Sequence, residues 1–196
     1  MLLAIALSLP LFLPSGDPPI RVKLSDDVFA RGERARVRVK ATQNGYLLVL
    51  RADAQGRIRV LFPLEPTDAA AIRAGKELEV RGRGDRDAFT VDDGEGSGKI
   101  LAAIFAEPFR TDAFARGGHW DYRALALADS GGAADTEATL LALVQQMAGG
   151  AYDYDIATYT VTNQPRYRRA PMWGWGGWGG RWGGWYGPRC YRCGWW

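Results

Sequence analysis

A single histidine, His119, limits the catalysis that this chain could carry out. A Ser-His-Asp or Cys-His arrangement needs an imidazole as its general base, so either one would have to use this residue. The sequence has no Gly-x-Ser-x-Gly turn that would present a nucleophile, and Ser25, Ser97 and Ser130 lie in turn-like sequence. We therefore interpret His119 as a hydrogen-bonded surface residue and predict that the protein is not an enzyme. A hydrolase that uses His119 is the alternative.

Acidic residues offer two further kinds of chemistry. Asp92 and Asp93 are adjacent, and Asp153 and Asp155 are close, as the paired carboxylates of a glycosidase would need to be. The segment 92–97 also holds several oxygen ligands beside glycines, but it lacks the spacing of an EF-hand loop. Adjacent acids in a hairpin loop are usually solvated turn residues. The sequence therefore predicts no metal and no cofactor.

Cys190 and Cys193 form the most specific motif, Cys-Tyr-Arg-Cys. In an exported protein such a pair is expected to be oxidised. Three interpretations stay open: a disulfide that closes a small loop, pairing between chains that cross-links copies, or half of a zinc site completed by a second chain. A thioredoxin-like role is excluded, because it needs the pair at a helix N-terminus and this pair lies in glycine-rich sequence.

Residues 163–196 form a basic, low-complexity segment of glycine, tryptophan and arginine. The whole chain carries a net charge of +3, while this segment holds six arginines and no acid, which leaves −3 for residues 1–162. Glycine opposes regular structure entropically, so we predict a disordered tail. Its rings and cations suit stacking on sugars, bases or one another, or insertion at a membrane interface; simple self-association without a specific ligand is the alternative. The candidate binding residues are Trp173, Trp175, Trp178, Trp182, Trp185, Arg181 and Arg189.

Residues 1–16 are uncharged and mostly apolar, and the run stops at Asp17. The run is short for a membrane span and is typical of the apolar region of a secretory signal peptide. It has no preceding cation and no clear cleavage motif, so a buried N-terminal strand is the alternative. We expect export to the periplasm, the cell envelope or the medium, which argues against nucleic acid as a partner.

The residues between these two segments show the period-two alternation of β-strands. Asn44-Gly45 predicts a type I′ turn, which would pair Val39 with Leu50 in a hairpin. Leu140, Leu141, Val144 and Met147 recur at helical spacing and predict one amphipathic helix over residues 136–148. The expected fold is mainly β: a sandwich of short antiparallel strands over residues 17–162 with this helix docked on it. Strands are predicted at residues 20–24, 34–41, 46–50, 57–62, 77–80, 88–92, 99–106 and 152–161.

The stretch 45–63 resembles the signature hairpin of DUF4384, a bacterial family often attached to caspase-like peptidase or Ser/Thr-kinase domains. Later pieces at 74–76, 89–91 and 99–104 match in order, followed by Pro108. The resemblance covers roughly residues 20–110. It implies an all-β accessory domain and brings no catalytic residues.

These patterns together predict an exported, non-catalytic interaction module. Its tail would adhere to an unknown protein or envelope polymer, to a membrane surface, or to other copies of the chain. The alternative is a structural protein that is cross-linked through Cys190 and Cys193.

Overall fold

The computed structural model describes residues 18–84, 87–127 and 136–164. Predictions for the signal peptide and for the tail therefore lie outside the described residues. No helix in the described ranges is long and apolar enough to cross a membrane.

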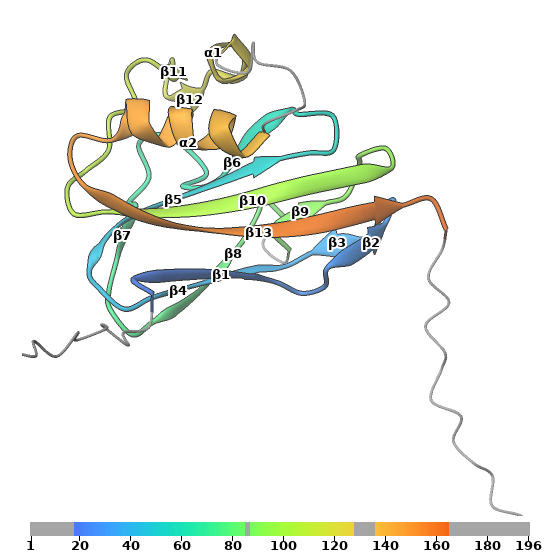
Figure 1. The fold of residues 1–196 in the computed structure, drawn as a ribbon. Helices are drawn as coiled ribbons and strands as arrows, with labels where there is room; N and C mark the ends of the chain where they lie inside the picture. The colour runs from blue at the N-terminus through green and yellow to red at the C-terminus, as the bar shows by residue number, and fades with distance from the viewer. Residues whose placement is uncertain (1–17, 85–86, 128–135, 165–196) are drawn as a thin grey trace, which may run out of the picture. The chain divides into compact units, whose positions relative to one another are not determined.

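Two sheets form the sandwich. A three-stranded sheet has the order β1-β4-β8, and a six-stranded sheet has the order β2-β13-β10-β5-β6, with β7 paired to β5 (Figure 1). Pairing is antiparallel except between β2 and β13, which run parallel. The three-stranded sheet comprises β1 (Ile20–Leu24), β4 (Val37–Ala41) and β8 (Glu77–Val80). The six-stranded sheet comprises β2 (Val28–Ala30), β5 (Gly45–Ala52), β6 (Ile58–Phe62), β7 (Ala71–Ile72), β10 (Gly96–Phe105) and β13 (Tyr152–Thr162).

Smaller elements complete the described fold. Two short strand pairs join β3 (Arg34–Ala35) to β9 (Phe89–Thr90), and β11 (Ala115–Arg116) to β12 (His119–Trp120). Two helices, α1 (Tyr122–Leu127) and α2 (Thr136–Met147), lie on the face of the six-stranded sheet that is turned away from the other sheet (Figure 1). The mainly β fold class predicted from the sequence is confirmed.

The six-stranded sheet separates two hydrophobic cores. On β5, Leu47 and Val49 pack between the two sheets, whereas Leu48 and Leu50 pack beneath the helices. β10 divides its side chains in the same way. This is why both strands are apolar on both faces: they are central strands covered on each side.

The predicted hairpin through Asn44-Gly45 is wrong. β4 and β5 belong to different sheets, and Val39 pairs with Val22 and Leu78 rather than with Leu50. Gly45 has no positive φ; instead, a Cβ there would lie 2.5 Å from the carbonyl oxygen of Phe105. Alternation fixes which face of a strand is buried but not which strand pairs with it, so this turn carries the chain from one sheet to the other.

A type I′ geometry occurs elsewhere, at Gly117-Gly118. Both residues have positive φ, 60° and 83°, and they connect β11 to β12 with Arg116 opposite His119. Two successive positive φ values are what this turn requires, and glycine supplies them without steric strain.

The predicted helix over residues 136–148 is confirmed as α2. Its buried face holds Leu140, Leu143, Val144 and Met147, so Leu143 takes the core position expected for Leu141, which is only partly buried. The sequence-based reading missed α1. Its N-cap is Asp121, whose Oδ1 accepts hydrogen bonds from the backbone N–H groups of residues 123 and 124.

Candidate binding cleft at the β6 edge

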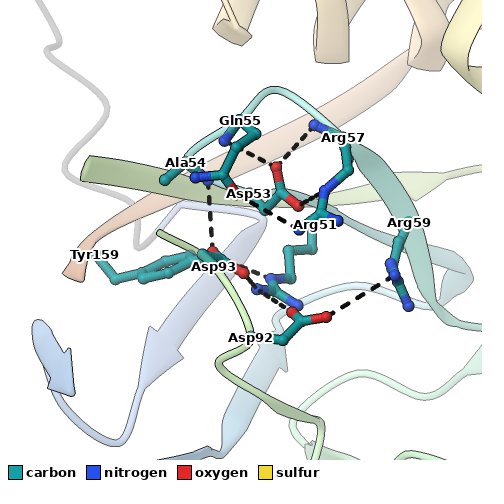
Figure 2. A network of polar contacts seen from close by, with 9 residues as sticks. All are labelled: Arg51, Asp53, Ala54, Gln55, Arg57, Arg59, Asp92, Asp93 and Tyr159. Atoms are coloured by element: carbon teal, nitrogen blue, oxygen red, sulfur yellow. Dashed lines mark hydrogen bonds and ion pairs between the residues drawn. The ribbon is translucent and has the colours of Figure 1, made fainter. Parts of the chain in front are cut away.

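A buried cluster of Arg51, Asp93 and Tyr159 joins three segments of the fold (Figure 2). The Arg51 Nε donates to the Tyr159 hydroxyl at 2.9 Å, and that hydroxyl donates to Asp93 Oδ2 at 2.9 Å. The Arg51 Nη2 donates to Asp93 Oδ1 and closes the triangle. The exposed fractions of the Arg51 and Asp93 side chains are 3% and 0%. Each charge is thus removed from water and compensated by the other, as buried ions must be.

This environment changes the pKa of two of its members. Burial alone would lower the pKa of Arg51, but the Tyr159 hydroxyl and the Asp93 carboxylate outweigh it and raise that pKa above its ordinary value. Burial raises the pKa of Tyr159, with Arg51 opposing the shift and Asp93 adding to it. Arg51 is therefore a fixed cation and Tyr159 a fixed neutral hydroxyl at all physiological pH values.

Aromatic rings enclose the Arg51 guanidinium. Its Cζ lies 4.0 Å from the centre of the Phe89 ring, a cation–π distance. Tyr159 in turn contacts Phe29 edge to face, with ring centres 5.9 Å apart. The cluster therefore ties the centre of the six-stranded sheet to the segment around β9.

The turn between β5 and β6 is organised by Asp53. Its Oδ1 accepts hydrogen bonds from the backbone N–H groups of Gln55 at 2.9 Å and Arg57 at 2.8 Å, while its Oδ2 pairs with the Arg57 Nε (Figure 2). Gly56 has a positive φ of 80°, which this tight connection requires. The turn fixes the position of Arg57 at the start of β6.

A cleft of about 870 Å³ runs beside β6, with Arg51 at one wall. α1 contributes apolar and aromatic atoms to its helix side, and the segment around β9 forms its other side. Its lining residues are Arg51, Gln55, Gly56, Arg57, Ile58, Arg59, Val60, Leu61, Leu64, Arg83, Ala88, Phe89, Thr90, Asp92, Tyr122 and Ala126.

The cations of this cleft are more exposed than most of the acids that pair with them. Four arginines line it, at positions 51, 57, 59 and 83, against one lining acid, Asp92. Outside the lining, Asp93, Asp53 and Glu65 pair with Arg51, Arg57 and Arg83, but these acids are only 0%, 4% and 25% exposed, against 53% for Arg57 and 77% for Arg83. Arg59 lies 4.0 Å from Asp92 and Arg51 lies 3.6 Å from it. Partial burial opposes ionisation of Asp92, but its hydrogen bonds and the two arginines outweigh this effect and hold its pKa below the usual value. The side chains of Arg57 and Arg59 remain about half exposed, so they are accessible to an anionic ligand.

His119 lies in a separate polar contact near the Arg83 side of the cleft. Its Nδ1 is 3.0 Å from Glu65 Oε2, and Glu65 also pairs with Arg83. The hydrogen bond from His119, with the charge of Arg83 adding to it, lowers the pKa of Glu65 despite a small opposing effect of desolvation. His119 itself is 72% exposed, and the sequence-based interpretation as a hydrogen-bonded surface residue agrees with this position.

The interpretation of the adjacent acids as solvated turn residues is wrong for Asp93, which has no exposed surface. Asp153 and Asp155 lie on the same strand and have different hydrogen-bond partners: Asp153 accepts from the Gln43 amide and Asp155 from the Val22 backbone N–H. Within the described ranges, no group of three or more His, Cys, Asp or Glu residues is placed to hold a metal ion.

The sequence-based reading also missed Arg51. It directly follows the predicted strand 46–50, and the observed β5 extends past it to Ala52. A cation at the end of so apolar a strand needs a buried partner, and that requirement was the available signal, although it does not identify the partner. The predicted tail candidates, Cys190, Cys193, Trp173, Trp175, Trp178, Trp182, Trp185, Arg181 and Arg189, lie outside the described residues.

The described residues thus define a class of protein: a mainly β sandwich that carries an arginine-lined cleft at the edge of one sheet. Residues 28–108 of it match the model of the family described as a domain of unknown function, DUF4384, which confirms the predicted resemblance. The matched part contains Arg51 and Asp93, whereas Tyr159 and the two helices lie beyond it. No curated protein and no solved structure matches the chain.

Proposed function

We propose that this protein is a non-catalytic binding module and that the cleft beside β6 is its binding surface. The observation that carries the proposal is the lining of this cleft: four arginines, three of them more than half exposed, beside a strand that has a neighbour on one side only among the described residues. Concave sites with a few convergent polar groups are the usual location of ligands. Because Arg57 and Arg83 are much more exposed than the acids that pair with them, the cleft predicts an anionic partner.

The state of the polar groups supports a binding role over a catalytic one. Asp93 and Tyr159 are buried and engage Arg51, so neither of them is placed to reach a substrate. His119 contacts Glu65, whose lowered pKa keeps the carboxylate of Glu65 ionised. This carboxylate is therefore poorly suited to accept a proton at neutral pH.

Two further parts of the proposal rest on the sequence. The apolar residues 1–16 support export, and the tryptophan- and arginine-rich residues 163–196 support adhesion to an envelope polymer, a membrane surface or other copies. A structural role with cross-links through Cys190 and Cys193 is the alternative. Electrophoresis without reductant separates the two, because adhesion alone produces no covalent ladder.

The test of the cleft uses the mature full chain and two charge reversals. Arg59→Glu acts in the cleft, while Arg38→Glu is a matched control on β4, with a similarly exposed side chain that is not part of the cleft lining. Each protein is incubated with soluble extract proteins coupled to beads, and the bound amount is measured over a range of concentrations. The proposal expects a weaker interaction for Arg59→Glu alone. Equal binding by all three proteins would remove the cleft as the binding surface.

A further inference from the structure

We propose that the cleft binds an extended segment of a partner protein in which acidic and apolar side chains alternate, and that this segment adds to β6 as a new strand. The inference rests on the proposed function and specifies its ligand. Three features of the described residues carry it: the unpaired edge of β6, the separation of arginines from apolar groups on the two sides of the cleft, and the poor fit of other occupants.

The first feature is the edge of β6. Among the described residues, β6 is hydrogen-bonded to β5 alone. The Arg57 carbonyl accepts a hydrogen bond from the Asp53 backbone N–H at 3.1 Å, so residue 57 points its backbone groups toward β5. Backbone groups alternate in direction along an antiparallel strand, which turns those of Ile58 and Val60 toward the cleft. An added strand would satisfy these groups, as in β-strand addition.

The second feature is that charged and apolar side chains line opposite sides of the cleft. Ile58 and Val60 pack into the core beneath the helices, so the intervening Arg59 lies on the opposite face of β6, toward Asp92. On the helix side the cleft is completed by Tyr122 and Ala126. Tyr122 is one of the two large hydrophobic side chains that are exposed in the described residues, at 49%.

An added strand would project successive side chains to these two sides. Every second side chain would meet the arginines, and the intervening ones would meet the apolar side chains below α1. The favoured sequence therefore alternates acidic and apolar residues. A ligand with acids alone would leave Tyr122 and the apolar wall uncovered.

The third feature is that two other possible occupants of the cleft, the tail of this chain and a second copy of it, carry an unfavourable charge. The tail of this chain holds six arginines and no acid, so it is a poor match for a cleft lined by arginines. A second copy that paired through its own β6 would place Arg57 and Arg59 close to their counterparts, and like charges across a strand pair are destabilising. An acidic segment of another protein avoids both conflicts.

The experiment measures binding of fluorescein-labelled hexapeptides to the full chain by fluorescence anisotropy. The probe is Glu-Val-Glu-Val-Glu-Val, and the control of equal composition is Glu-Glu-Glu-Val-Val-Val. Two further probes carry N-methyl groups on alternate backbone amides, one on each set, so that each blocks one edge of the added strand. The same series is measured with Arg59→Glu and Arg38→Glu.

We expect the alternating peptide to bind about tenfold more tightly than the block control, and Arg59→Glu to weaken it about tenfold while Arg38→Glu does not. One N-methylated set should weaken binding by a similar factor, and the other should have little effect, because only one edge of the peptide faces β6. This readout does not depend on any variant of the protein folding correctly.

Equal binding of the two N-methylated probes and the block control would overturn the inference in favour of a general polyanion site. Tighter binding of heparin or single-stranded nucleic acid than of any peptide would do the same. If no peptide binds while Arg59→Glu still reduces partner capture, the ligand is wrong but the binding surface stands. If Arg59→Glu changes neither measurement, both proposals fail.

Discussion

The ring of Tyr159 lies over Gly98, its partner on the adjacent strand β10. A Cβ at position 98 would lie 2.3 Å from the Tyr159 Cζ and 2.4 Å from its hydroxyl oxygen. The absence of a side chain at this one position lets the tyrosine ring lie flat enough to bring its hydroxyl to Arg51 and Asp93. Glycine in a strand interior commonly marks such a close approach.

Replacing Gly98 by alanine should therefore destabilise the fold. The new methyl group overlaps a ring that is fixed at both ends, so we expect a loss of about 1–3 kcal/mol in the free energy of unfolding. Urea denaturation followed by circular dichroism measures it. Gly150→Ala is the matched control, because a Cβ at residue 150 has no heavy atom within 4 Å. An equal effect of the two substitutions would show that the contact with Tyr159 is not responsible.

Removal of one partner of the buried ion pair should cost more than removal of both. Arg51→Met leaves Asp93 without its counter-ion, at a cost of about 3–5 kcal/mol. Asp93→Leu leaves Arg51 with only the half-exposed Asp92 at 3.6 Å. The double variant Arg51→Met/Asp93→Leu should lose less stability than Arg51→Met alone. A double-mutant cycle in urea gives the coupling energy.

The exposed pair Arg38–Glu77 provides the comparison for that cycle, with charged atoms 3.8 Å apart. Its coupling energy should be at most about 1 kcal/mol, because solvent screens exposed charges. Similar coupling energies for the two pairs would contradict the role assigned to burial at Arg51.

Stability at high pH should depend on Tyr159. Its pKa is raised in the folded protein, so the native state keeps a proton that the unfolded chain releases above about pH 10. The stabilisation is fully present below that pH and is lost as the pH rises. Urea midpoints between pH 8 and 11 should therefore fall more steeply for the wild type than for Tyr159→Phe. Parallel curves for the two proteins would show that Tyr159 titrates normally.

The tail prediction is tested by a chain that ends at Asn163. Both hydrophobic cores lie within residues 18–164, so this version is expected to fold, and circular dichroism verifies it. In sedimentation with insoluble envelope material and with lipid vesicles, only the full chain should be retained, with a component that weakens as salt is added. Equal sedimentation of both versions would place adhesion on the sandwich instead of the tail.

Elements with strong local patterns were predictable. The final strand, observed as β13, follows from the β-propensity of its residues, and the helix α2 follows from side-chain periodicity. A single segment carries both signals within itself. The family resemblance could be identified for the same reason, since the stretch 45–63 is distinctive without reference to its neighbours.

Turn signals were less reliable, and the two glycine turns show why. Asn44-Gly45 has the composition of a type I′ turn but joins strands of different sheets, while Gly117-Gly118 makes that turn in a segment with no predicted hairpin. Turn propensity reports which backbone angles are accessible. Which strands then pair depends on the burial of whole faces.

The sequence by itself determined the fold class, the amphipathic helix and the strong contrast between a slightly acidic domain and a basic tail. Only the tertiary structure decided which charges are buried together. Arg51, Asp93 and Tyr159 are separated by up to 108 residues, and their contact follows from the strand order and from the space left by Gly98. The arginine-lined cleft arises in the same way, because the strand order leaves one edge of β6 without a neighbouring strand among the described residues.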